Sequence, residues 1–173
     1  SLDALKQLKT GAGRQWSTTQ VLRDNGFNVV TGTKFEGLFW MLMGERFVTF
    51  GRGVNEAASE VIQKRSLFPD IEIEKNFALY IPMPTFFYVS PKHPKLAQRI
   101  AVGLDKLIDS GEFDKLFYQF HLDMITDADL SKRTVYSLHN KNLPAKVPLQ
   151  QPEYWYKPGD ELAVLNSANI AGN

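Results

Sequence analysis

The stretch that bears most on the fold is Gly11-Ala12-Gly13-Arg14-Gln15-Trp16-Ser17-Thr18-Thr19. It connects a short apolar segment to a helical pattern. Ser17 and Gln20 have the spacing of a capping box. In this motif the hydroxyl of the first residue accepts a hydrogen bond from the backbone N–H three residues later, and the side chain of that later residue accepts one from the backbone N–H of the first. The unpaired N–H groups and the positive dipole end of such a helix start attract a carboxylate or a phosphate. Arg14 would add a full positive charge. The stretch therefore indicates either a well-capped helix or an anion site.

Apolar residues alternate between helical and extended spacing along the first half of the chain. Asn25-Gly26 and Gly44 stand where helices would end, because glycine suits the backbone of a helix C-terminus. A strand–helix–strand order of this kind predicts an α/β fold with a parallel sheet and helices on both sides, a three-layer lobe. The expected strands cover residues 6–11, 27–30, 47–50 and 71–73, and the expected helices cover residues 18–24, 35–43 and 54–62.

The pattern changes after residue 76. Ile81-Pro82-Met83-Pro84 cannot be helical, since each proline forces extended backbone on the residue before it, and we interpret this stretch as a stiff connection between lobes. A strand at 86–90, a helix opening at Pro91 or Pro94 and a short helix at 113–120 are expected beyond it. From about residue 131 the chain is expected to be irregular. The predicted division is residues 5–82, 83–130 and 131–173.

Composition excludes several classes of function. The 173 residues carry a formal net charge of +1, which indicates no general attraction to nucleic acid or to an anionic membrane. The absence of cysteine excludes disulfides and thiolate chemistry. No apolar stretch has the length of a membrane span. The first residues lack a basic and an apolar signal region, so no signal peptide is expected here and the start resembles an internal one.

A search for catalytic sets gives none, and we expect binding without chemistry. His93, His121 and His139 are scattered, with no second ligand at metal spacing, so each is interpreted as a surface histidine. Glu56 and Glu60 lie one helical turn apart, which is more typical of a solvated helix face than of an acid–base pair. No dinucleotide fingerprint or P-loop is present, so neither a cofactor nor a metal is expected.

A second polar loop supports the interpretation of the first as a binding site. Arg52 lies between two glycines at the end of the strand at 47–50, and Asn55 follows it. The carboxyl ends of parallel strands meet at one edge of a sheet, so this loop and residues 14–19 should face the same side. The fork of Arg52 suits bidentate capture of a carboxylate, although an arginine in a turn can also simply face solvent.

The order of these motifs resembles extracellular solute-binding proteins of family 3, which have the type 2 periplasmic binding protein fold. The resemblance lies in the Trp-Ser-Thr-Thr helix start, Phe-Glu-Gly-Leu-Phe at 35–39, Arg-Phe-Val-Thr-Phe-Gly-Arg-Gly-Val-Asn-Glu at 46–56, and the crossover at 80–90. The run Ile-Asp-Ser-Gly-Glu-Phe-Asp-Lys-Leu-Phe at 108–117 is similar to the C-terminal helices of that family. The resemblance covers residues 3–120.

The resemblance implies two α/β lobes that close around a solute and deliver it to the membrane permease of an ATP-driven (ABC-type) importer, outside the cytoplasm or in the periplasm. It implies a complete second lobe at about residues 5–80, followed by a returning part of a first lobe whose opening half is not in this chain. Closure would occur about Ile81, Pro82, Met83 and Pro84. The implied ligand-binding residues are Arg14, Trp16, Ser17, Thr18, Thr19, Arg52, Asn55 and Glu56.

The chain departs from the family where amino-acid binders carry an aspartate after the third strand of this lobe. Glu56, one turn into the following helix, is the candidate substitute. The helix start suited to a carboxylate is kept and the amino-acid signature is not, so we expect a small polar, anionic solute and assign no amino acid as the ligand. A ligand-sensing module of a signalling protein is the alternative function. An enzyme of the same fold is the third interpretation, and no paired acid and base in one loop cluster favours it. Apolar surface without its partner lobe predicts self-association.

Overall fold

The computed structural model describes residues 1–164, and the chain divides into two compact units. The N-terminal unit consists of residues 1–83 and 132–145. The helical unit consists of residues 84–131 together with the described residues from 146 onward. The chain therefore passes between the units three times, and residues far apart in the sequence complete the N-terminal unit.

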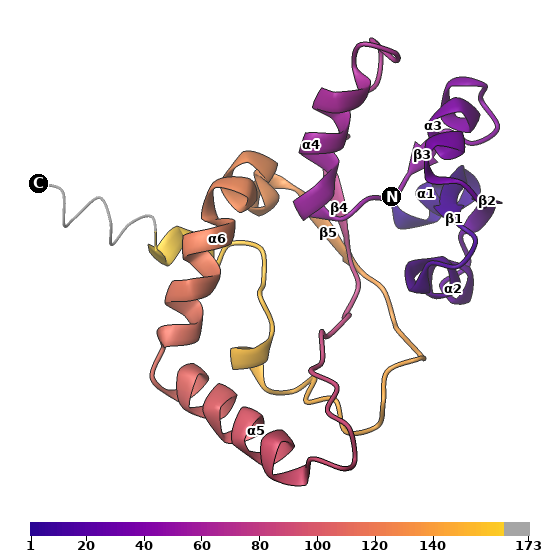
Figure 1. The fold of residues 1–173 in the computed structure, drawn as a ribbon. Coiled ribbons are helices and arrows are strands. Elements are labelled where there is room, and N and C mark those ends of the chain that lie inside the picture. Colours follow the sequence, from indigo (N-terminus) through magenta and orange to yellow (C-terminus); the bar gives the residue numbers. More distant parts are fainter. Residues whose placement is uncertain (165–173) are drawn as a thin grey trace, which may run out of the picture. The chain divides into compact units, whose positions relative to one another are not determined.

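A three-stranded parallel sheet organises the N-terminal unit, in the order β2-β1-β3 (Figure 1). Its strands are β1 (Lys9–Gly13), β2 (Asn28–Gly32) and β3 (Thr49–Phe50). The register pairs Gly11 of β1 with Val30 of β2 and with Phe50 of β3. The glycine at position 11 leaves room for an aromatic ring, because a Cβ there would overlap the ring of Phe47. The predicted α/β character with parallel pairing is confirmed.

Four helices cover this sheet through two separate clusters of buried apolar residues. They are α1 (Leu2–Gln7), α2 (Ser17–Asp24), α3 (Phe35–Met43) and α4 (Val54–Lys64). Helices α1 and α2 supply Leu5, Val21 and Leu22 to one cluster. Helix α3 supplies Phe39 to the other, where Phe68 and Ile71 join it and Val61 of α4 packs against it. The apolar residues at helical spacing in the sequence are therefore the ones that these helices place against the two clusters.

A second, two-stranded parallel sheet joins β4 (Phe77–Tyr80) to β5 (Thr134–Ser137). Residues from 131 onward were expected to be irregular, and β5 departs from that expectation. Beyond β5, Leu138 is buried in the cluster formed by α1 and α2. The Asn25 side chain pairs with the backbone of His139 in both directions, at 2.8 and 3.0 Å. These contacts fix the returning segment to α2.

The strand expected at residues 71–73 does not form. The alternation there reflects one buried anchor, Ile71, which packs beside Phe68, while Glu72 and Ile73 are exposed. No described strand pairs with this segment, so its backbone has no ladder to join.

The helical unit contains α5 (Pro94–Asp109), α6 (Glu112–Ala128) and a short 3₁₀ turn at Pro152–Tyr154. Another 3₁₀ turn, Leu130–Lys132, spans the boundary between the two units. His93 is the N-cap of α5 and Pro94 lies in its first turn, so the helix opens at Pro94 and not at Pro91, the other start that the sequence allowed. Helix α6 is longer than the expected 113–120, because its apolar spacing continues to the buried Ile125.

The strand expected at 86–90 is absent, since no described strand pairs with it, and Phe87 and Tyr88 are exposed. No described helix is both long and apolar enough to cross a bilayer.

Candidate functional site

Two loops of the N-terminal unit meet at the carboxyl edge of its three-stranded sheet. Trp16, from the loop after β1, stacks on Phe50 at the end of β3, with ring centroids 6.0 Å apart and planes 13° apart. The guanidinium of Arg52, from the loop after β3, lies 4.6 Å from the centre of the Trp16 ring. The prediction that these loops share one edge is therefore confirmed.

Arg52 is the most constrained charged group of this edge. Its Nε and Nη2 donate to the two carboxylate oxygens of Glu60 at 2.7 and 2.6 Å, and Nη2 also lies 2.9 Å from Glu56. The rings of Phe35 and Phe50 lie 5.1 and 5.7 Å from the guanidinium, which adds cation–π attraction. The hydrogen bonds with Glu60 outweigh the opposing effect of burial and raise the pKa of Arg52.

The environment of Arg52 changes the role that the sequence predicts for it. Its fork is filled by Glu60, whose side chain is only 15% exposed. The two carboxylates together exceed the one positive charge by one, so this loop offers an acidic group no net attraction. Arg52 instead fastens α4 to the aromatic rings beside the sheet.

The start of α2 is built differently from the predicted capping box. Trp16 is the N-cap and Ser17 is already helical, so no side chain caps this helix. Gln20 donates to Asp24, one turn onward, and does not return to the helix start. The buried hydroxyl of Thr19 donates to the Gly13 carbonyl at 2.6 Å and ties the helix to the end of β1. Thr19 thus has a structural bond where the sequence predicts a ligand contact.

Hydrogen-bond donors remain open at this helix start. Among the described residues, the N–H groups and hydroxyls of Ser17 and Thr18 have no hydrogen-bond partner. The Arg14 side chain is exposed and has no hydrogen-bond partner within residues 1–164, and its backbone N–H donates to the carbonyl of Gly32. These three residues can donate to an anion, assisted by the positive end of the α2 dipole.

Asn55 and Glu56 occupy the first turn of α4. The Glu56 carboxylate accepts a hydrogen bond from the Gly53 N–H, which precedes the helix, at 3.3 Å. Asn55 is exposed. Glu56 therefore acts on its own helix and on Arg52, while 45% of its side chain stays open to solvent.

Sequence reasoning missed Glu60, Phe35 and Phe50 as neighbours of the site. Glu60 was interpreted as part of a solvated face, and its burial beside Arg52 corrects that interpretation. The signal was present in the spacing, because Glu56 and Glu60 lie one turn apart on one side of α4, and Arg52 precedes Glu56 by the same four positions.

The residues predicted as a hinge stand at the boundary between the two units, which falls between Met83 and Pro84. Ile81 packs against the cluster formed by α1 and α2. The Pro82 carbonyl accepts a hydrogen bond from the side chain of the buried Asn140 at 2.9 Å. The first two hinge residues are thus bound to the N-terminal unit.

The remaining candidates give no further site. His121 lies against the ring of Phe117, His93 is the N-cap of α5, and the backbone N–H of His139 donates to the Asn25 side chain. Within residues 1–164, no cluster of three or more histidines and acids is placed to hold a metal ion. No family model, curated protein or solved structure matches the chain.

Gly13→Ala is expected to displace Trp16, because a Cβ at this position would overlap the indole ring. The ring would leave Phe50, and the emission of Trp16 should shift to longer wavelength as its exposure to water rises. Fluorescence in a Trp40→Phe/Trp155→Phe background measures the shift. Gly51→Ala is the matched control, since a Cβ there meets nothing within 4 Å. Equal spectra for the two variants would contradict the packing described.

Proposed function

We propose that this chain is a solute-binding domain of the type 2 periplasmic kind, which captures a small polar anion outside the cytoplasm for an ABC-type importer. The observation that carries the proposal is the set of open donors at Arg14, Ser17 and Thr18, placed at the carboxyl edge of a parallel sheet. Ligands of open α/β sheets bind at that edge. The order of the sequence motifs resembles that family and supports the proposal, and the parallel α/β sheet is compatible with it.

The charges around the site narrow the solute. A carboxylate fits the α2 start, where Arg14 and the N–H groups of Ser17 and Thr18 donate. A second acidic group that reached the neighbouring loop would face the surplus negative charge of Glu56 and Glu60. We therefore propose a solute with one acidic group and a neutral polar or apolar remainder, for which Trp16 forms a wall.

Capture of the solute is a binding step without covalent chemistry. The N-terminal unit holds Ile81 and Pro82 through its core and Asn140, so a closing motion would bend the chain at Met83 and Pro84 and at the two other passages between the units, residues 131–132 and 145–146. A sensing module would use the same capture step, and a membrane permease would be needed only for transport.

The test follows Trp16 emission in the Trp40→Phe/Trp155→Phe chain during titration with lactate, succinate and inorganic phosphate. Lactate should bind more tightly than succinate. Arg14→Ala and Ser17→Ala/Thr18→Ala should each weaken binding by about 10-fold or more, because a hydrogen bond to a charged group contributes about 1.5–3 kcal/mol.

Arg23→Ala is the matched control, since it removes an exposed arginine from the last turn of the same helix. Its affinity should equal that of the parent chain. If Arg14→Ala weakens binding no more than Arg23→Ala does, the placement of the site is wrong. Tighter binding of succinate would refute the charge argument.

A further inference from the structure

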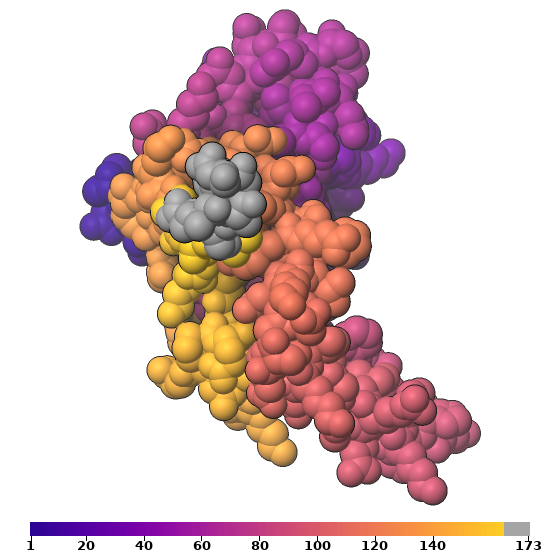
Figure 2. Space-filling model, turned by 90° about the vertical axis from the view of Figure 1, so that its left-hand side faces the viewer, coloured from indigo at the N-terminus to yellow at the C-terminus, as the bar shows by residue number. Residues whose placement is uncertain are grey.

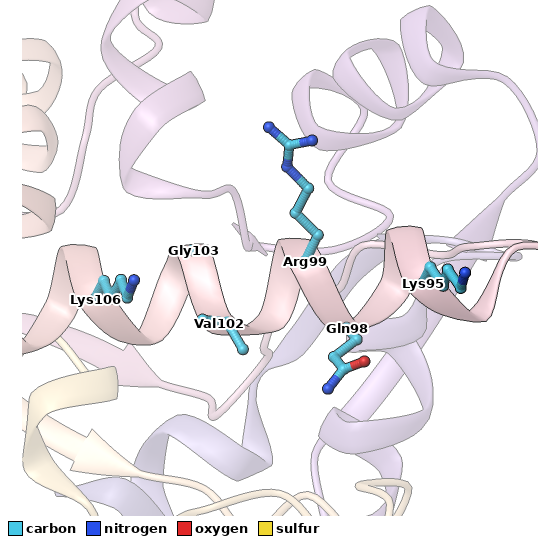
Figure 3. A pocket seen from close by; sticks show the side chains of 6 residues that line it. All are labelled: Lys95, Gln98, Arg99, Val102, Gly103 and Lys106. Atoms are coloured by element: carbon cyan, nitrogen blue, oxygen red, sulfur yellow. The ribbon is translucent and has the colours of Figure 1, made fainter.

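Helix α5 presents one continuous basic stripe to solvent. Lys95, Arg99, Val102 and Lys106 follow the spacing i, i+4, i+7, i+11, which places them on one side of the helix. All four are exposed, and none of the sixteen residues of α5 is fully buried. Figure 3 shows these side chains spread along α5, with Arg99 extending to one side of the helix axis and Val102 to the other; together with Gln98 and Gly103 they line a hollow.

Helix α6 presents a second exposed stripe of opposite character. Phe113, Leu116 and Phe120 form its apolar part, and Asp123 and Asp127 continue it at the same spacing. Phe120 is 74% exposed, an unusual condition for a phenylalanine in the middle of a helix. Phe117, which borders this stripe, packs against Tyr156, and Ile125 is buried on the opposite side of α6. In Figure 2, α5 and α6 both lie at the molecular surface on the face turned to the viewer.

The two stripes are complementary in one alignment. Because α-helices rise equally per residue, an antiparallel pair that places Phe120 against Val102 also places Asp123 against Arg99 and Asp127 against Lys95. Leu116 then meets the methylene chain of Lys106. A parallel pair with Phe120 at the same place would set Asp123 near Asp105 and Asp127 near Asp109, where like charges repel. Charge therefore selects the antiparallel alignment.

Within one chain the stripes do not meet. The helices join at Ser110 and Gly111, where Gly111 has a φ of +74°, and they diverge from that turn (Figure 1). Lys95, Arg99, Asp123 and Asp127 make no ion pair among the described residues. A two-fold axis that brings α5 of one copy against α6 of another brings the reverse pair together as well, which closes the assembly at two chains.

We propose that the α5 and α6 stripes form the interface of a homodimer, in which α5 of each copy packs antiparallel to α6 of the other. Phe120 of one copy fills the hollow beside Val102 and Gly103 of its partner, and the pairs Arg99–Asp123 and Lys95–Asp127 set the alignment. This surface lies within the helical unit and does not depend on the solute site.

Sedimentation velocity on the full chain over a range of concentrations tests the proposal. The parent chain should pass from monomer to dimer and stop there. Arg99→Glu alone and Asp123→Arg alone should each weaken dimerisation at least 10-fold, and the double variant Arg99→Glu/Asp123→Arg should restore it. Arg23→Glu, the same charge reversal on exposed α2 of the other unit, should leave it unchanged. Circular dichroism would verify that each variant is folded.

Other results would overturn the proposal. A monomer at every concentration would do so, and if Arg99→Glu then lowered the melting temperature, the stripes would pair within one chain. A monomer that sediments with anionic lipid vesicles would assign the surface to a membrane. Dimers that ignore both single reversals, or assemblies that grow without limit, would refute the alignment or its symmetry.

Discussion

Phe47→Ala is expected to lower the free energy of unfolding of the N-terminal unit by about 3–5 kcal/mol, the usual effect of removing a buried aromatic ring. Phe47 has no exposed surface. Its ring packs on Gly11 of β1 and lies 5.9 Å from the ring of Phe50. The vacated space borders the glycine, which has no side chain to fill it, so the cavity should persist. Urea unfolding followed by far-UV circular dichroism measures the change.

Phe87→Ala is the matched control, because Phe87 is 70% exposed. Its loss should change stability by about 0.5 kcal/mol or less, as is typical of exposed positions. A small effect of Phe47→Ala, similar to that of the control, would mean that the sheet does not depend on the ring against Gly11.

Glu60→Gln is expected to destabilise the same unit by about 1.5–3 kcal/mol, the contribution of hydrogen bonds to charged groups. The amide keeps the shape of the carboxylate but removes its charge, and it leaves the largely buried Arg52 with Glu56 as its remaining charged partner. The rings of Trp16 and Phe35 should then hold the guanidinium less firmly. Thermal unfolding of the parent and the variant measures the loss.

Glu56→Gln should cost less, because the Glu56 carboxylate is 45% exposed and water screens its attraction to Arg52. The ratio of the two effects is the informative quantity. If Glu56→Gln were the more damaging variant, Arg52 would be held mainly from the helix start, and the pairing with Glu60 would be secondary.

Local patterns predicted three helices of the N-terminal unit well but missed α1 (Leu2–Gln7), which covers the first residues of the strand expected at 6–11. Helices α2, α3 and α4 begin and end close to their predicted limits, since apolar spacing and glycine stops act within a few residues. The prediction of a strand at 71–73 was wrong, because the apolar–polar–apolar order of these residues resembles a strand although only Ile71 is buried. Strand β5 was missed because its partner β4 lies more than fifty residues earlier, and no local signal records such a pairing.

The sequence predicted where the two loops of the candidate site lie, but not the hydrogen-bond partners of their side chains. Parallel topology placed the loops of Trp16 and Arg52 together, which follows from the sheet alone. Whether Arg52 is open to a solute depends on which acid reaches it, and that depends on the packing of α4 against the rings. Thr19 is similar, since its hydroxyl serves the Gly13 carbonyl only because α2 begins one residue earlier than the capping pattern suggests.

The return of residues 132–145 into the N-terminal unit bears on the order in which the protein matures during synthesis. Leu138 belongs to the cluster under α1 and α2, and Asn140 holds the Pro82 carbonyl. A ribosome must therefore release α5 and α6 before the first eighty residues have all their core partners. Nascent chains that end near residue 130 should be protease-sensitive in their N-terminal part, and chains extended past residue 145 should gain resistance there.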